Sequence, residues 1–323
     1  MPADDSIVLL GAARTRAALP LDRLIVALRA AFAGAASLPT RHHHPIARPD
    51  GDDGTLLLMP AWQGQSLGVK IATIFPGNGA RGLSTVHSSY LLSDASTGVP
   101  IALLDGNEIT ARRTIAVSAL AASYLAREDA ESLLIVGAGR LGQLAASAFA
   151  EVRPIRRVAI WNRDAAKAET LAARLRGEGV DASVVSSLQH AAGDADIISC
   201  ATPSTEPLIR ADWLRPGTHL DLIGSFTPEM READDACLAR GKVYVDTFDA
   251  LVEAGDLLGP IANGMFRAQD VEGSLADLCS GRVVGRQDAA DLTVFKAVGT
   301  ALADLAAAML VQETFCPPLP GRP

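Results

Sequence analysis

The sequence predicts an α/β fold in which a doubly wound Rossmann domain is joined to a mixed α/β domain. The first observation is a glycine-rich turn at 137–142 that lies between an apolar run and a helical stretch. The second is the alternation of strand and helix patterns that continues from there to about residue 246, which is typical of a parallel sheet. The third is that residues 1–115 lack this alternation. A chain of 323 residues is long enough for both domains.

The glycine-rich turn has the pattern of a dinucleotide-binding site. Apolar residues at 133–136 predict a buried strand, and 143–150 predict the helix that follows. Gly137 permits the tight turn, Gly139 lets a pyrophosphate approach the backbone, and Gly142 lets the helix pack closely on the strand. Because strand and helix flank the glycines, the motif favours a nicotinamide dinucleotide over an ordinary turn. The turn residues expected to contact the cofactor are Gly137, Gly139, Arg140 and Leu141.

The residues after the next predicted strand indicate which dinucleotide binds. The strand over 157–161 ends at Asn162, about where NAD-binding chains place an acid on the ribose 2′-hydroxyl. An acid would repel a 2′-phosphate, whereas Asn162 can donate a hydrogen bond to it and Arg163 can form a charge-assisted pair. We therefore expect NADPH, with NADH as the alternative cofactor. In the other interpretation, Arg163 is a solvated surface residue and Asp164 binds the ribose.

Further cofactor contacts are expected where later strands end, because ligands of open parallel sheets bind at the carboxyl ends of the strands. The loops that contain Thr202 and Ser225 are therefore expected to reach the nicotinamide or its ribose. We assign residues 116–289 to this NADP-binding domain. Its remaining expected elements are a helix over 165–176 and strands over 195–201, 218–223 and 242–246.

The substrate-binding domain is expected to combine residues 1–115 with 290–323. An amphipathic helix over 289–311 is expected to return to it, since a trailing helix needs a surface against which to bury one face. The proline-rich tail at 316–323 is expected to be loose. The other expected elements are helices over 21–33 and 110–127, and strands over 55–59, 66–74, 84–93 and 100–104.

Composition argues against several classes of protein. Apolar residues make up 49% of the chain and charged residues 20%, values typical of a globular protein. The net charge of −8, with no basic block, argues against a nucleic-acid partner. No apolar run is long enough to span a membrane, and the acidic N-terminus lacks the basic segment of a signal peptide. Four scattered cysteines with no C-x-x-C pair favour a reduced protein of the cytoplasm without structural zinc.

Basic residues of the first domain are the candidates for substrate binding. Lys70 lies in an otherwise apolar strand, Arg112 and Arg113 lie near the start of the long helix, and Arg41 follows a Pro-Thr pair. Taken alone, each is more often a solvated surface charge than a ligand-binding residue.

Five segments, in order and with the expected spacing, are similar to signatures of the ornithine cyclodeaminase/mu-crystallin family. They are the segments 68–71, 75–78, 110–116, 137–142 and 216–224. The resemblance covers nearly the whole chain, and Gly142, which is often Ala or Ser in that family, is a harmless difference. It implies a homodimer of two-domain subunits. One domain forms the dimer interface and holds a small substrate, and the Rossmann domain holds the nicotinamide cofactor.

The resemblance also implies roles for the basic residues. By position, Arg41 and Arg113 resemble the arginines that bind the substrate carboxylate, whose two oxygens match a guanidinium fork. Lys70 resembles the active-site lysine. Partial desolvation beside the arginines would help it to lose a proton and act as a general acid. Arg112 is less suited and is expected to be exposed.

One departure from the family favours a reductase. Cyclodeaminases and the related alanine dehydrogenase carry an aspartate for amine chemistry in the loop where Phe226 stands here, and phenylalanine cannot accept a proton. The sequence of residues 225–228 resembles members that reduce Δ1-pyrroline-2-carboxylate and Δ1-piperideine-2-carboxylate to L-proline and L-pipecolate. Hydride would reach C2 of a cyclic imine that binds already protonated or that Lys70 protonates. The alternatives are an ornithine cyclodeaminase using catalytic NAD, an L-alanine dehydrogenase, and a non-catalytic NADP-binding crystallin-like protein.

Several other polar residues are expected to be structural. The histidines at 42–44 are expected in a loop near the substrate entrance without a metal, because consecutive histidines cannot all face one ion and no acid or cysteine cluster accompanies them. His87 and His219 are expected to be structural. Asp221 and Asp246 lie near strand ends, where each either lines the cleft or caps the next element.

Overall fold

The computed structural model describes residues 7–49 and 51–315. The chain divides into two compact units: unit 1 comprises Met1–Arg113 and Thr300–Pro323, and unit 2 comprises Thr114–Gly299. The first division lies close to the expected one. The second lies about ten residues later than expected, because the intervening residues add a strand to the sheet of unit 2. The proline-rich tail lies outside the described residues.

Within the described residues, unit 1 is built on a six-stranded sheet with the order β1-β6-β5-β4-β3-β2. The four expected strands are confirmed, and the pairs from β2 to β6 are antiparallel. β3 continues past its expected end and includes Pro60. A proline is tolerated at this position because β2 pairs with β3 only as far as Leu58, so no backbone N–H is needed on that side. The strands are β1 (Val8–Leu10), β2 (His42–Ile46), β3 (Gly54–Gln63), β4 (Ser66–Ile74), β5 (Val86–Asp94) and β6 (Pro100–Asp105).

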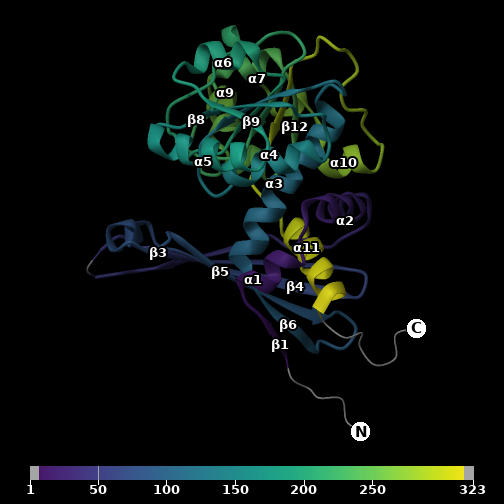
Figure 1. Ribbon diagram of the computed structural model, residues 1–323. Helices are drawn as coiled ribbons and strands as arrows, with labels where there is room; N and C mark the ends of the chain where they lie inside the picture. The colour runs from purple at the N-terminus through teal and green to yellow at the C-terminus, as the bar shows by residue number, and fades with distance from the viewer. Residues whose placement is uncertain (1–6, 50, 316–323) are drawn as a thin grey trace. The chain divides into compact units, whose positions relative to one another are not determined.

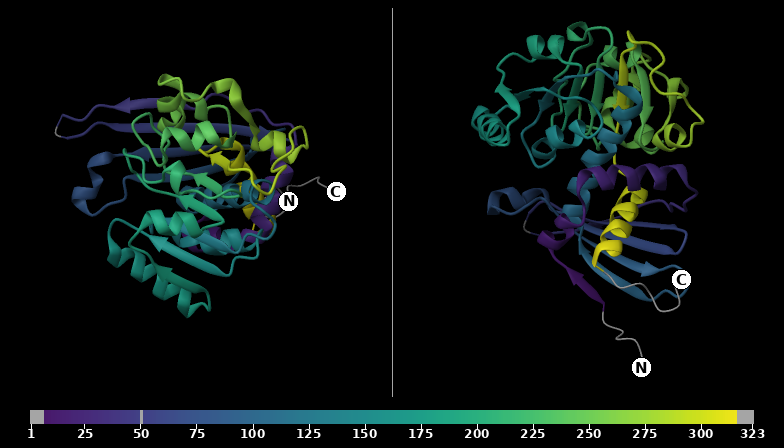
Figure 2. Two further views of the ribbon diagram at one scale, coloured as in Figure 1. Left: turned by 90° about the horizontal axis from the view of Figure 1, so that it is seen from above. Right: turned by 45° about the vertical axis from the view of Figure 1, so that its right-hand side comes forward.

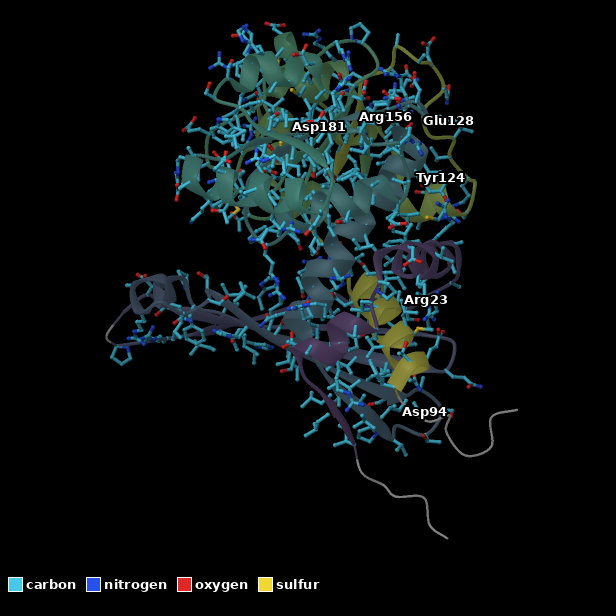
Figure 3. All side chains as sticks on the ribbon, viewed as in Figure 1. Arg23, Asp94, Tyr124, Glu128, Arg156 and Asp181 are labelled. Atoms are coloured by element: carbon cyan, nitrogen blue, oxygen red, sulfur yellow. The ribbon has the colours of Figure 1, made fainter. Side chains whose placement is uncertain are left out.

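Helices cover one face of this sheet. α2 (Leu21–Ala33) and α11 (Ala301–Phe315) lie on the same face, and α11 packs on β3, β4 and β5 (Figures 1 and 2). Arg23, labelled on α2 in Figure 3, reaches within 3.7 Å of Glu313 on α11. The remaining helical elements of unit 1 are α1 (Ala12–Ala17), the 3₁₀ helix η1 (Pro76–Arg81) and the start of α3 (Gly106–Leu125).

The expected amphipathic helix over 289–311 is wrong in its first half. Residues Thr293–Lys296 form β14, which lies between β11 and β12 in the middle of a parallel sheet. β14 is buried on both faces but consists of Thr-Val-Phe-Lys, so it shows neither the alternation of a half-buried strand nor a continuous apolar run that would mark a buried one. The helix begins only at Ala301, and most of its residues are buried on every side rather than along one stripe.

The expected loop at 42–44 is also wrong. These histidines form the edge strand β2, paired antiparallel with β3. Their side chains are exposed, and the rings of His42 and His44 stack with centroids 6.2 Å apart. Three consecutive polar residues do not show the alternation of a half-buried strand, since an edge strand with two solvated faces has no apolar face to reveal. The described residues contain no cluster of potential metal ligands.

Unit 2 has the predicted Rossmann architecture. Its described residues form an eight-stranded sheet in the order β13-β12-β14-β11-β10-β7-β8-β9, with every neighbouring pair parallel. Figure 1 shows α4 and α5 on one side of the strands and α6, α7 and α9 on the other. The strands are β7 (Ser132–Val136), β8 (Arg157–Trp161), β9 (Asp181–Val184), β10 (Ile197–Cys200), β11 (His219–Leu222), β12 (Lys242–Val245), β13 (Val271–Ser274) and β14 (Thr293–Lys296).

The helices of unit 2 connect successive parallel strands and bury the sheet. No helix in the described part of the chain is long and apolar enough to cross a membrane. The helical elements are α4 (Gly142–Ala150), α5 (Ala165–Gly177), α6 (Leu188–Asp194), η2 (Ala211–Trp213), α7 (Asp235–Arg240), α8 (Ala250–Glu253), α9 (Gly255–Ala262), η3 (Ala268–Asp270) and α10 (Leu275–Cys279).

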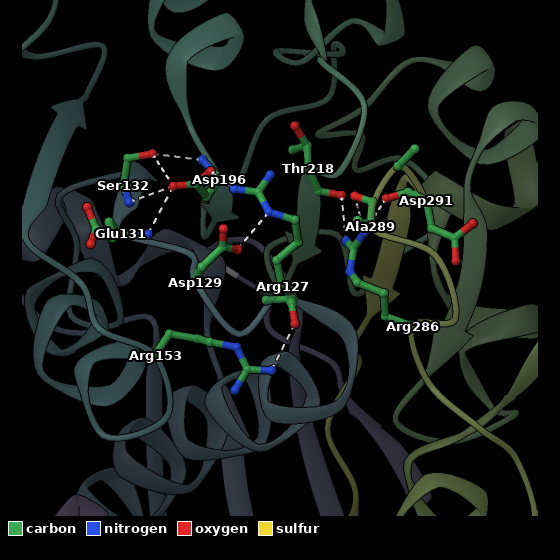
Figure 4. Close-up of polar contacts among 12 residues, drawn as sticks. Arg127, Asp129, Glu131, Ser132, Arg153, Asp196, Thr218, Arg286, Ala289 and Asp291 are labelled. Carbon is green, nitrogen blue, oxygen red and sulfur yellow. Dashed lines mark hydrogen bonds and ion pairs between the residues drawn. The ribbon is translucent and has the colours of Figure 1, made fainter.

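A polar cluster ties together the edge of this sheet at which the strands begin (Figure 4). The Asp196 carboxylate, just before β10, accepts hydrogen bonds from the backbone of Glu131, the backbone and hydroxyl of Ser132, and the guanidinium groups of Arg127 and Arg215. Burial opposes its ionisation, but these hydrogen bonds and charges outweigh it and hold the pKa of Asp196 below its usual value. The cluster therefore joins β7 and β10 at their first residues.

Candidate active site

Lys70 is buried in the middle of β4. Alternate residues of this strand face the helix-covered side of the sheet, so period-two geometry carries Lys70 inside and leaves Ile71 outward. Its Nζ atom lies 2.7 Å from Oδ2 of Asp304, on the first turns of α11. Burial lowers the pKa of Lys70 to about 8. Asp304 opposes that shift, and Arg113 and Arg41 add to it.

Arg113 meets the same carboxylate from α3. Its Nε donates to Oδ1 of Asp304 at 2.8 Å, and both side chains are almost completely buried. Burial works against ionisation of Asp304, but Arg113 and Lys70 outweigh it and keep the pKa of the carboxyl below its usual value. Two cations share one anion, so the cluster holds an excess positive charge suited to a carboxylate ligand. Among the described residues, Arg113 makes its hydrogen bond through Nε alone, which leaves its terminal nitrogens for such a ligand.

The other two arginines differ in their surroundings. Arg41 is half-buried just before β2, and its charge contributes to the lowered pKa of Lys70, so unit 1 brings all three predicted residues within electrostatic range. Arg112 is half-buried rather than exposed as expected, because its Nε donates to the carbonyl of Leu19 at 2.6 Å. Arg112 thus fixes the segment after α1.

A buried phenol lies next to Lys70. Tyr90 stands directly opposite Lys70 in the antiparallel pair β4–β5 and is fully buried, and its hydroxyl has no hydrogen-bond partner among the described residues. Its ring covers Gly68, where a Cβ atom would lie 2.0 Å from the hydroxyl oxygen. The pKa of Tyr90 is raised well above its usual value by burial and by Asp304. Gly68 is therefore the residue that makes room for an aromatic ring beside the lysine.

The glycine-rich turn has the geometry of a phosphate-binding turn. Gly137 has a φ of +110°, which favours glycine, and a Cβ atom there would lie 2.7 Å from the carbonyl oxygen of Ala201. A Cβ on Gly142 would lie 1.9 Å from the carbonyl oxygen of Gly137, so the helix packs closely on the turn. A Cβ on Gly139 would meet nothing within 4 Å, which leaves its backbone open to a ligand. Arg140 is exposed and Leu141 half-buried just before α4.

The loop after β8 supports one interpretation of the cofactor over the other. Asn162 accepts a hydrogen bond from the backbone of Ala138 at 3.0 Å and donates to the carbonyl of Asp164 at 2.9 Å, so it ties this loop to the glycine turn. The Asp164 carboxylate caps α5 by accepting from the backbone of Ala166. Arg163 is exposed between them. The Asp164 carboxylate is engaged as a helix cap and is less available to a ribose hydroxyl. The Asn162 amide, expected to donate to a 2′-phosphate, already donates within the loop, so the preference for that phosphate depends on the exposed Arg163.

The loops after β10 and β11 lie at the carboxyl ends of adjacent strands, as expected. The Thr202 hydroxyl donates to the buried Glu232 carboxylate at 2.8 Å. The Ser225 hydroxyl is fully buried, where it donates to the carbonyl of Met230 and accepts from the backbone of Asp256. Both hydroxyls therefore shape their loops, and any effect of Ser225 on a cofactor would act through its loop. Phe226 is half exposed in the same loop.

The remaining polar residues are structural. His219 is buried, with Nδ1 3.0 Å from the Thr293 hydroxyl, and burial lowers its pKa to about 3. Asp221 is buried in β11 and accepts from Ser199, so it does not cap the next element. Asp246 accepts from the backbone of Thr247, Val298 and Gly299, which anchors the chain after β14.

Comparisons with known proteins agree with this geometry. A model of the ornithine cyclodeaminase/mu-crystallin family matches residues 8–316. A Δ1-pyrroline-2-carboxylate reductase of Paracoccus denitrificans is 44% identical over 255 residues, which is 78% of this chain and 81% of that protein.

The chain belongs to the ornithine cyclodeaminase/mu-crystallin family.

Two solved structures share the fold of this chain over almost its whole length. The Δ1-pyrroline-2-carboxylate reductase of Thermococcus litoralis, in complex with NADH and L-proline, superposes with a TM-score of 0.89 at 31% identity and covers 95% of this chain and 97% of its own. An archaeal alanine dehydrogenase dimer with bound NAD gives a TM-score of 0.89 at 27% identity and covers 95% of each chain. The family resemblance inferred from five segments is confirmed.

The sequence pattern missed the acidic residues of both units. Asp304 is the only acid between Ala301 and Gln312, and a lone carboxylate in an alanine-rich helix is a usable signal of a buried ion pair. Glu232 and Asp256 gave no such signal, because they lie among other charged residues on the surface-like segments 229–235 and 253–256. Only the fold shows that both are fully buried.

Proposed function

We propose that the protein is an NADPH-dependent reductase of cyclic ketimines, which converts Δ1-pyrroline-2-carboxylate, Δ1-piperideine-2-carboxylate or both to L-proline and L-pipecolate. The observation that carries the proposal is the buried cluster of Lys70, Asp304 and Arg113. It combines an excess positive charge for a substrate carboxylate with an ammonium group from which burial helps to remove a proton. A nicotinamide-binding family member with both features is equipped to reduce an imino acid.

The residues of unit 1 have distinct tasks in this reaction. Arg113, whose terminal nitrogens make no hydrogen bond within the described residues, binds the substrate carboxylate together with Arg41, and the two so orient the ring. Lys70 holds a proton at Nζ and donates it to the imine nitrogen. Where the imine binds already protonated, Lys70 is in its neutral form, which its lowered pKa of about 8 favours, and so does not repel the cationic ring. Asp304 sets the position of both cations and touches neither ring nor cofactor in this scheme.

The residues of unit 2 fit a nicotinamide dinucleotide. The open backbone at Gly139 and the start of α4 suit a pyrophosphate. When bound, the cofactor supplies the hydride that adds to C2 of the imine. Arg163 is placed to select the 2′-phosphate of NADPH, and the capping role of Asp164 supports that choice.

Phe226 favours reduction over the ornithine cyclodeaminase reaction. Cyclodeamination needs a group that accepts a proton from the substrate amine, and the phenyl ring in this loop offers none. The same argument applies to L-alanine dehydrogenase activity. A silent cofactor-binding protein is disfavoured as well, since it has no need for a buried lysine and a buried arginine that share one carboxylate.

We also propose that the enzyme works as a homodimer in the cytoplasm. The archaeal alanine dehydrogenase neighbour is a dimer, and its fold covers 95% of this chain. The buried thiols of Cys200 and Cys237 are free, in keeping with a reducing compartment. Size-exclusion chromatography with light scattering would test the dimer, and a monomeric mass would reject it.

The proposed activity is tested by the oxidation of NADPH or NADH with each of the two cyclic imines. Rapid oxidation with NADPH and either imine is the expected result. Faster turnover with NADH would support the proposed reaction but reject the proposal that Arg163 selects NADPH. No oxidation with either cofactor would reject the reductase, and ornithine plus NAD with ammonia detection would then test the cyclodeaminase.

A further inference from the structure

One buried carboxylate in unit 2 joins the two loops at the end of the sheet where the cofactor is expected. Oε1 of Glu232 accepts from the backbone of Thr202 at 2.6 Å and from its hydroxyl at 2.8 Å. Oε2 accepts from the backbone of Gly224 at 2.6 Å. Thr202 lies two residues beyond β10 and Gly224 two residues beyond β11, so one side chain holds the loops that follow two neighbouring strands.

These loops touch one another closely. A Cβ atom on Gly224 would lie 2.0 Å from the carbonyl oxygen of Thr202 and 2.5 Å from Oε1 of Glu232. No side chain fits at this position, so the two backbones meet directly under the carboxylate. Beyond the strand ends the ladder no longer supplies hydrogen bonds, and the N–H groups of both loops depend on Glu232 as their acceptor.

The carboxylate is itself held in place. Glu232 is fully buried, and its backbone N–H donates to Oδ1 of Asp256 at 2.8 Å. Oδ2 of Asp256 lies 3.3 Å from Nζ of Lys296 at the end of β14, and both side chains are buried. Burial raises the pKa of Glu232 to about 7, and three hydrogen bonds of 2.6–2.8 Å to this buried acceptor make a stiff joint between the loops.

We propose that Glu232 is a positioning residue for the nicotinamide end of the cofactor, which it controls by locking the loops after β10 and β11 into a single arrangement. The inference rests on the proposed function, since it assumes that these loops border the nicotinamide. Under this proposal, different segments of unit 2 hold two parts of the cofactor. The glycine turn and the loop after β8 bind the adenosine and pyrophosphate part, and only the nicotinamide part depends on Glu232.

The test compares two ligands on one variant. Glu232→Gln keeps the size of the side chain but turns one acceptor oxygen into an N–H donor, which faces another donor at Thr202 or Gly224. We expect its dissociation constant for NADPH to rise about tenfold, the effect of one lost hydrogen bond to a buried acceptor. The dissociation constant for 2′-phospho-ADP-ribose, which lacks the nicotinamide, is expected to stay unchanged. If the wild type prefers NADH, ADP-ribose serves as the fragment.

The matched control is Glu206→Gln, the same substitution at an exposed position in the loop after β10. It is expected to change neither dissociation constant. If Glu232→Gln does not fold, Glu232→Asp keeps the carboxyl group but shortens the side chain that joins the two loops, and it is expected to weaken NADPH a few fold without affecting the fragment.

A Glu232→Gln variant that loses both ligands in parallel, or neither, would overturn the inference. The first result would mean that the residue only supports the fold of unit 2, and the second that the loops need no such joint. Wild-type protein that binds neither nicotinamide dinucleotide would instead overturn the proposed function, and this inference with it.

Discussion

Lys70 shows at the scale of one residue how burial and charge set a protonation state. Burial favours the neutral amine, Asp304 favours the ammonium, and the balance lowers the pKa to about 8. The ammonium therefore holds its proton below about pH 8 and loses it above. If Lys70 protonates the imine, the turnover number for reduction falls as the pH rises through about 8, as a kcat–pH profile would show.

Lys70→Met replaces the ammonium group by an uncharged side chain, so the variant has no proton to donate at this position. We expect kcat to fall on the order of 100-fold, the usual contribution of a general acid, and the inflection near pH 8 to disappear. The dissociation constant for NADPH is expected to stay the same, because unit 2 alone supplies the predicted cofactor contacts. An unchanged kcat would remove Lys70 from the reaction.

Arg113→Lys tests the carboxylate clamp. A lysine keeps the charge beside Asp304 but replaces the guanidinium fork by a single ammonium. We expect the KM for the imine to rise roughly 10- to 100-fold, about 1.4–2.8 kcal/mol, with a smaller effect on kcat. A KM equal to that of the wild type would show that Arg113 binds only Asp304.

The glycine turn makes a prediction at the scale of an element. Gly139→Ala meets no neighbouring atom, so we expect an unchanged melting temperature. Its methyl group would occupy the space through which a pyrophosphate approaches the backbone, and NADPH binding is expected to weaken about tenfold or more. Gly177→Ala, at the end of α5 and also without near neighbours, is the control and is expected to alter neither quantity. Equal NADPH affinity in both variants would contradict the role given to Gly139.

A substitution in the cluster around Asp196 is expected to lower stability and to leave ligand binding unchanged, the reverse of the expectation for Gly139→Ala. Asp196→Asn leaves donors from β7 and two arginines without their charged acceptor, and we expect a loss of about 2–4 kcal/mol of unfolding free energy with the KM for the imine unchanged. Because the pKa of Asp196 is lowered by folding, its contribution is present above pH 3.8 and is lost as the pH falls below that value. Asp194→Asn, an exposed neighbour, is the control for urea unfolding. Equal stability of the two variants would reject the cluster as a structural joint.

Elements were predictable from the sequence where their pattern is local. The strands around the glycine turn and the antiparallel strands of unit 1 follow from apolar periodicity and turn residues. The strands β14 and β2 could not be predicted from the sequence, for opposite reasons. β14 is covered on both faces and has no alternation, and β2 is exposed on both faces and has none either. Both are defined by the strands beside them.

Across the whole molecule, the candidate site combines residues that lie far apart in the sequence. Lys70, Arg113 and Arg41 could be picked out because family signatures surround two of them and position indicates the third. Asp304 lies 191 positions from Arg113, and only the fold brings them together. The same holds for Glu232, whose partners at Thr202 and Gly224 are backbone groups that no sequence motif records. The basic residues were thus predictable from the sequence, but the acidic residues Asp304 and Glu232 and their contacts were not.

The central claim is that hydride moves from the nicotinamide to C2 of a cyclic imino acid. The most direct measurement uses NADPH deuterated at the transferable position, with Δ1-pyrroline-2-carboxylate or Δ1-piperideine-2-carboxylate, and locates the label in the product by NMR. We expect L-proline or L-pipecolate with deuterium at C2. Product without the label at C2, or no turnover of either imine with NADPH or NADH, would contradict it.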